Sequence, residues 1–99
     1  MKYELAQNGK ELKVIVEGRL DTLSSPELEK ALDPVLKGVE KLVFDFSRLD
    51  YISSAGLRVV MHAHKNKNMG GETRVIHCNP VVKAVFEVTG LTNLMEVEG

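Results

Sequence analysis

The stretch that decides the fold is KLVFDFSRLDYISSAGLRVV, residues 41–60. Residues 41–46 are nearly continuously apolar, which is typical of a central strand buried on both faces of a sheet. Residues 47–51 are predicted to form a short loop, and a helix then begins at Ser53 or Ser54 and runs to about Asn68. The predicted inner face of this helix comprises residues at helical spacing, namely Leu57, Val60, Met61 and His64. The four small residues 53–56 would not be needed in a stretch that only fills a core.

The rest of the chain alternates predicted strands and helices. Residues 3–7, 11–17, 73–78 and 94–98 are predicted strands, and Asn8-Gly9 is a hairpin turn between the first two. One further helix is predicted to start at Ser24-Ser25-Pro26 and to end at Gly38, and another to run from Asn79-Pro80 to Thr89-Gly90. The sequence therefore predicts one α/β domain over residues 1–99, with helices packed on the sheet.

Composition excludes several classes of protein. A chain of 99 residues has room for one domain. The formal net charge of −1 provides no basic field for nucleic acid. No apolar run approaches the roughly 18 residues of a membrane span, and the N-terminus has no apolar signal segment. Cys78 is alone, so no disulfide framework is expected, and a cytoplasmic chain without membrane partners is predicted.

Three motifs, in order, resemble those of the STAS domain found in bacterial anti-sigma factor antagonists. They are GRLD at 18–21, FDFSRLDYISSAGLRVV at 44–60 and NPVVKAVFEVTGL at 79–91. Together they extend over nearly the whole chain, and the combination is far more specific than any one of them. The resemblance implies a small mixed β-sheet with helices packed on it.

The resemblance also implies a regulatory function. The family's phosphoacceptor lies two residues before a Gly-Leu pair, which gives Ser54; Ser53 stands where the family often has Asp. In the family, the unphosphorylated antagonist binds an anti-sigma factor that is also its serine kinase, and so frees a sigma factor for transcription. Phosphorylation breaks that complex and a serine phosphatase restores it. The resemblance therefore implies no catalytic residue and no cofactor.

A partner-binding surface is predicted around Ser54. Its predicted members are Asp21, Ser53, Ala55, Gly56 and Arg58. A side chain at Gly56 is expected to project beside Ser54 on the exposed first turn of the helix. A Gly56→Gln variant is accordingly expected to weaken partner binding more than it weakens the fold.

Other interpretations remain open at this stage. Ser54 is also explained as a simple helix N-cap, and a STAS-type module also fits a stress-signalling or lipid-transport assembly. A serine hydrolase would need the Gly-x-Ser-x-Gly elbow, which the chain lacks. His62 and His64 are two residues apart and face different sides of a helix, which argues against a metal site. Cys78 is predicted to be a small buried hydrophobic residue.

Overall fold

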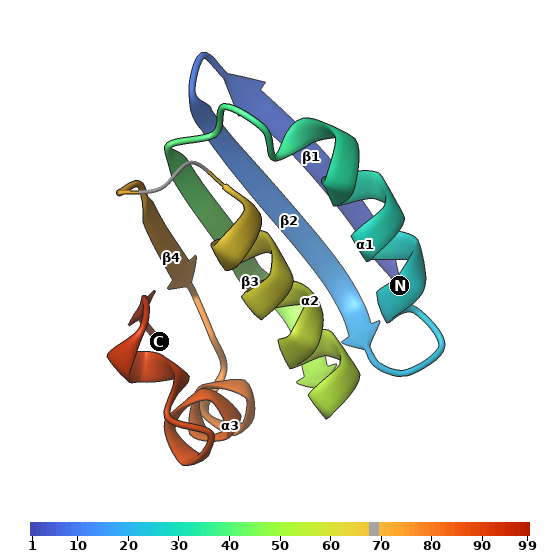
Figure 1. Cartoon of the computed structure of the whole chain (residues 1–99). Coiled ribbons are helices and arrows are strands. Elements are labelled where there is room, and N and C mark those ends of the chain that lie inside the picture. The colour runs from blue at the N-terminus through green and yellow to red at the C-terminus, as the bar shows by residue number, and fades with distance from the viewer. Residues whose placement is uncertain (68–69) are drawn as a thin grey trace.

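The computed structural model describes residues 1–67 and 70–99, which form a five-stranded sheet and three α-helices (Figure 1). The strands are β1 (Lys2–Asn8), β2 (Glu11–Leu20), β3 (Lys41–Ile52), β4 (Glu72–Ile76) and β5 (Glu96–Val97). The helices are α1 (Ser25–Leu32), α2 (Ser54–Asn66) and α3 (Pro80–Val88), with short 3₁₀ helices η1 (Asp33–Val35) and η2 (Leu91–Asn93).

The sheet is mixed, as the resemblance implied. The strands lie in the order β1-β2-β3-β4-β5; β1 pairs antiparallel with β2, and the other neighbours pair in parallel. Helices α1 and α2 lie side by side over one face of the sheet, while α3 lies at the end of the molecule where β3 finishes (Figure 1). Because β2 and β3 are parallel neighbours, their carboxyl ends lie at the same end of the sheet, and α2 begins there.

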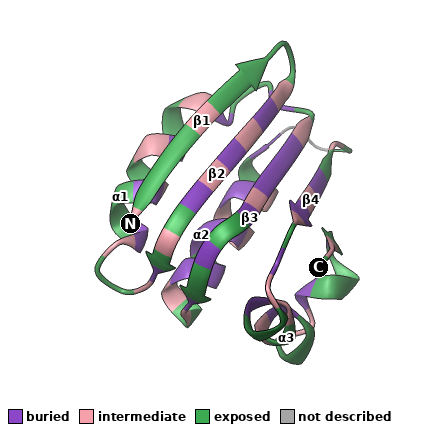
Figure 2. Cartoon of the chain, turned by 180° about the vertical axis from the view of Figure 1, so that it is seen from behind, coloured by how far each residue is buried: buried purple, intermediate pink, exposed green. Residues whose placement is uncertain are grey.

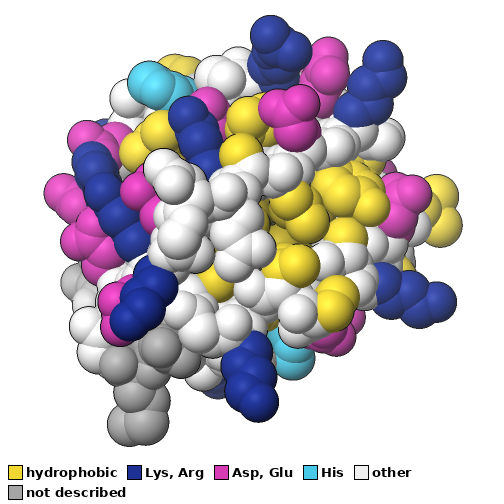
Figure 3. Space-filling model, turned by 90° about the horizontal axis from the view of Figure 1, so that it is seen from above, with side chains coloured by type: hydrophobic (Ala, Val, Ile, Leu, Met, Phe, Trp, Pro, Cys, Tyr) yellow, Lys and Arg dark blue, Asp and Glu magenta, His cyan; other side chains and the backbone are white. Residues whose placement is uncertain are grey.

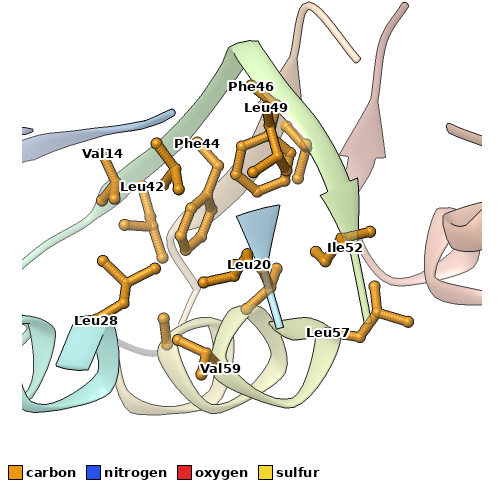
Figure 4. Close-up of a cluster of buried hydrophobic side chains, with 14 of the residues drawn as sticks. Val14, Leu20, Leu28, Leu42, Phe44, Phe46, Leu49, Ile52, Leu57 and Val59 are labelled. Atoms are coloured by element: carbon orange, nitrogen blue, oxygen red, sulfur yellow. The ribbon is translucent and has the colours of Figure 1, made fainter. Parts of the chain in front are cut away.

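The core lies between the sheet and the helices. Phe44 and Phe46 of β3 point toward the layer that contains Leu28 of α1 and Val59 of α2 (Figure 4). The ring centroids of Phe44 and Phe46 are 5.7 Å apart, and that of Phe46 lies 6.3 Å from that of Phe86, so a row of aromatic rings joins α3 to β3.

Among the described residues, no helix covers the opposite face of the sheet (Figure 2). Ion pairs join neighbouring strands there, with Lys13 Nζ 3.7 Å from Asp45 Oδ2. Val43 is nevertheless buried, because it lies in register between Lys13 and Arg74, whose long aliphatic stems flank it. The prediction that the central strand is buried on both faces is therefore confirmed at Val43. The aliphatic parts of charged side chains, and not a helix, cover this residue.

The strand predicted at 41–46 is longer than expected, and the predicted loop 47–51 is wrong. Strand β3 continues to Ile52, because β2 also extends to Leu20 and pairs with it along this length. The pairing register shifts between Ile15 and Glu17 and between Gly18 and Arg19, which indicates β-bulges at these positions. Such bulges break the two-residue alternation that identifies a strand, so the pattern looks like a loop.

Two helices also differ from prediction. Helix α1 ends at Leu32 and not near Gly38, because Pro34 has no N–H to continue the α-helical hydrogen bonds, and the chain passes into η1. Helix α2 ends at Asn66; its predicted end, Asn68, lies outside the described residues. The buried face of α2 is rotated toward α1 relative to the prediction, and consists of Gly56, Leu57, Val59, Val60 and Ala63.

On the face of the molecule seen in Figure 3, hydrophobic side chains gather in the middle and right of the view, and side chains of both charges lie around them. This face carries no field of a single sign, in keeping with the net charge of −1. Within the described residues, no helix is both long and apolar enough to span a bilayer.

Candidate functional site at the start of α2

The candidate site lies where β2 and β3 end together. Leu20 pairs in register with Ile52, and the backbone N–H of Ser53 donates to the Leu20 carbonyl over 2.9 Å. Asp21 directly follows β2 and Ser53 directly follows β3, so the two residues lie next to each other at one end of the sheet. Asp21 therefore lies beside the start of the serine stretch.

The two serines have different positions. Ser53 is the N-cap of α2, in an extended conformation, and its Oγ accepts from the Gly56 N–H over 3.4 Å. Ser54 is the first residue of the helix and its side chain is exposed. Since Ser53 occupies the cap, the Ser54 hydroxyl lies at the positive end of the helix dipole without a capping role.

Gly56 faces the end of β2, so its predicted exposure on the first turn of α2 is wrong. The residue is buried, and a Cβ atom placed on it would lie 2.7 Å from the Leu20 carbonyl oxygen and 2.7 Å from Ile52 Cγ1. Separations under 3.0 Å are essentially never seen for real Cβ atoms, so a side chain here requires the end of β2 to move. The glycine is needed because the first turn of α2 packs directly on the backbone of β2.

Asp21 organises the loop between β2 and α1. Its Oδ1 accepts from the N–H groups of Ser24 and Leu23, each over 3.1 Å, and the Ser24 hydroxyl in turn accepts from the Asp21 N–H over 2.9 Å. These hydrogen bonds, with Ser24 foremost and a nearby Arg19 guanidinium, hold the pKa of the Asp21 carboxyl below its ordinary value. Ser24 occupies the predicted N-cap position of α1. Its hydroxyl, however, forms hydrogen bonds within the loop and no capping hydrogen bond to the helix.

Arg58 and Ala55 line a groove between α1 and α2. The groove has a volume of about 350 Å³, and Ser25, Glu29 and His62 also line it. Arg58 is exposed and lies one helical turn after Ser54, on the same side of α2. The predicted residues Asp21, Ser53, Ala55 and Arg58 therefore surround the start of α2, whereas Gly56 lies beneath it.

Two exposed apolar side chains lie at this end of the sheet that the sequence did not predict. Leu23, in the loop that Asp21 organises, is 91% exposed. Tyr51 is 37% exposed, and the Arg19 guanidinium lies 4.4 Å from the centre of its ring. The spacing of apolar residues cannot show that a leucine in a loop is exposed, because its exposure depends on the conformation of the loop.

Two of the three histidines, His62 and His64, make contacts between elements of the fold. The His62 Nε2 atom lies 3.0 Å from Asp33 Oδ1 and ties α2 to η1, while His64 Nδ1 lies 2.7 Å from the Thr73 hydroxyl. Burial lowers the pKa of His64, and the positive charges of Lys67 and Lys65 add to this effect. Among the described residues, no three His, Cys, Asp or Glu side chains are grouped closely enough to hold a metal ion.

Cys78 is buried, as predicted, and burial raises the pKa of its thiol to about 11. The thiolate is the reactive form, so at pH 8 the folded protein is expected to react with a disulfide reagent about 100-fold more slowly than the unfolded chain. The measurement is the rate of thiol modification in buffer and in concentrated guanidinium chloride. Equal rates in the two solvents would contradict this expectation.

Comparison with known proteins gives a family match over residues 3–96, to the model described as "Mlab, STAS domain". The chain is similar to a protein of Bordetella bronchiseptica described as an anti-sigma factor antagonist, BtrV. The two are 38% identical over 84 residues, which make up 83% of this chain and 72% of the relative.

Solved structures share the fold. An anti-sigma factor antagonist from Mycobacterium paratuberculosis superposes with a TM-score of 0.87 at 21% identity, over 98% of this chain and 84% of the other. The Bacillus cell fate determinant SpoIIAA in its phosphorylated form superposes with a TM-score of 0.76 at 19% identity, over 97% of this chain and 90% of the other.

Proposed function

Because this chain belongs to the STAS-domain family, we propose that its role as an anti-sigma factor antagonist rests on reversible binding to an anti-sigma factor that is also a serine kinase. In this proposal, the unphosphorylated protein occupies the anti-sigma factor in the cytoplasm and releases the sigma factor. Phosphorylation of Ser54 dissociates the complex, and a serine phosphatase reverses the modification. The chain is a substrate and a binding partner, with no chemistry of its own.

The observation that supports the proposal most directly is that Ser53 and Ser54 have different positions at the start of α2. Ser53 caps α2, and this leaves the exposed Ser54 hydroxyl available for modification. A phosphate at Ser54 would carry about −1.5 to −2 charges at pH 7 and would lie beside the free N–H groups of the first turn. The helix end favours such a charge, so the fold is expected to survive the modification.

The partner surface that we propose surrounds Ser54. It comprises Asp21, Ser53, Ala55 and Arg58 from the sequence prediction, and Leu23 and Tyr51 from the structure. A partner seated there would have to desolvate the phosphate dianion, which opposes binding. The phosphorylated form of SpoIIAA, which has the same fold, supports the compatibility of this fold with a phosphate.

The proposal is tested by phosphate mapping. The anti-sigma factor is recovered by pull-down from the host lysate with and without ATP, then incubated with the pure chain and ATP. We expect one phosphate, on Ser54. Ser54→Ala is expected to abolish phosphorylation, and the matched variant Ser53→Ala to retain it while losing about 1 kcal/mol of stability with the cap. Fragmentation spectra that place the phosphate on Ser53 would refute the assignment.

A further inference from the structure

The exposed side of α2 carries positive charges and no negative ones. The helix contains no Asp or Glu, and its Arg and Lys residues, Arg58 and Lys65, are both exposed. Lys65 lies in the last turn, where the helix dipole stabilises a cation. Arg58 lies near the opposite end, where the dipole gives a cation no such stabilisation. The stability of α2 therefore does not account for an arginine at this position.

The Arg58 guanidinium has no ion-pair partner among the described residues. Glu29 of α1 lines the same groove as Arg58, but its carboxylate lies beside His62, with Oε1 3.9 Å from Nδ1. Arg58 is therefore an exposed cation that is available to an anion placed within its reach.

Ser54 lies within the reach of Arg58. Four residues along an α-helix amount to one full turn plus about 40°, so Ser54 and Arg58 project from neighbouring positions, and both are exposed. Side chains at this spacing have Cβ atoms about 5–6 Å apart, which the long stem of an arginine can span. An anion four residues before a cation is also the more favourable of the two orders along a helix.

We propose that Arg58 is the receptor for the phosphate on Ser54. The inference rests on the proposed function, in which Ser54 is the phosphoacceptor. Once the phosphate is present, the Arg58 guanidinium turns toward it and donates charge-assisted hydrogen bonds to its oxygens. The dianion then lies between the Arg58 side chain and the positive end of the α2 dipole, and both favour it.

The ion pair changes the proposed partner surface in two ways at once. Phosphorylation adds negative charge at Ser54, and the pair takes up the Arg58 cation that the unphosphorylated surface exposes. A phosphate with about −1.5 to −2 charges keeps a net negative charge after it pairs with one guanidinium, so a partner would still have to desolvate it. A partner that binds Arg58 through an acidic side chain of its own would lose that contact in the same step.

A double-mutant cycle in melting temperature tests the pair without a kinase. Phosphoserine is installed at position 54 during translation, in the otherwise unmodified chain and in Arg58→Gln, and each protein is compared with its unphosphorylated counterpart. We expect the phosphate to raise the melting temperature by about 2–8 °C more when Arg58 is present. Lys65→Gln is the matched control, because it removes a positive charge from an exposed position of α2 about three turns from Ser54. Its gain from the phosphate should equal that of the unmodified chain.

The NMR signal of the Arg58 side chain tests direct contact. Its Nε–H resonance, identified by its absence from Arg58→Gln, is expected to shift downfield and to exchange more slowly with water in the phosphorylated chain. An equal gain in melting temperature with and without Arg58, or an unchanged Nε–H resonance, would overturn the proposal. So would a gain that Lys65→Gln reduces as much as Arg58→Gln does, because the attraction would then depend on the overall charge of α2. These outcomes do not depend on which serine a kinase modifies, which the phosphate mapping decides separately.

Discussion

Gly56→Gln is expected to lower the melting temperature by about 8–16 °C, which corresponds to a net loss of about 2 kcal/mol. The Cβ atom alone would approach the Leu20 carbonyl oxygen to 2.7 Å, and the rest of the side chain would have to enter a packed contact between α2 and β2. Overpacking of this kind costs about 3 kcal/mol, which is more than the gain of up to about 1 kcal/mol from removing a glycine from a helix. For a domain of this size, 1 kcal/mol corresponds to about 4–8 °C.

Arg58→Gln is the matched control, because Arg58 lies on the exposed side of the same helix and receives the same side chain. Its melting temperature is expected to stay within a few degrees of the unmodified protein. Thermal unfolding of both variants by circular dichroism is the measurement. A Gly56→Gln protein that melts normally but has lost affinity for its partner would restore the sequence-based view that Gly56 faces the interface.

Ser54→Asp is expected to weaken binding to the anti-sigma factor by about 10- to 100-fold relative to Ser54→Ala. The interface would have to desolvate a carboxylate for which it holds no partner, and such a penalty is about 2 kcal/mol or more. Alanine keeps the surface small and uncharged, so Ser54→Ala should bind like the unmodified protein and should no longer be released by ATP.

Stability should change in the opposite direction. The carboxylate of Ser54→Asp would lie at the N-terminus of α2, where the helix dipole favours a negative charge by about 0.3–1 kcal/mol. Its melting temperature is therefore expected to equal or slightly exceed that of Ser54→Ala. Thr92→Asp, which adds the same charge at an exposed position in η2, should leave affinity unchanged. Equal affinities for Ser54→Asp and Ser54→Ala would argue against an electrostatic switch at this residue.

The sequence predicted the order of strands and helices because these are local patterns. Two-residue alternation identified β2, and helical spacing identified α2. A polar residue before the first turn placed the start of α2 at Ser53 or Ser54 and the start of α3 at Asn79-Pro80. Pro34 is a local signal for the end of α1. The prediction instead followed the helical spacing of apolar residues, which continues to Leu36, and so placed the end of the helix too late.

The register between β2 and β3 depends on residues 30 to 32 positions apart in the chain, and no local pattern encodes it. That register brings the Leu20 carbonyl beneath Gly56 and places Asp21 beside Ser53. The sequence alone thus determined that small residues open α2 and that Ser54 belongs to a STAS-like motif. Only the tertiary structure decided which small residue faces solvent and which faces the sheet, because that depends on how closely α2 packs on the end of β2.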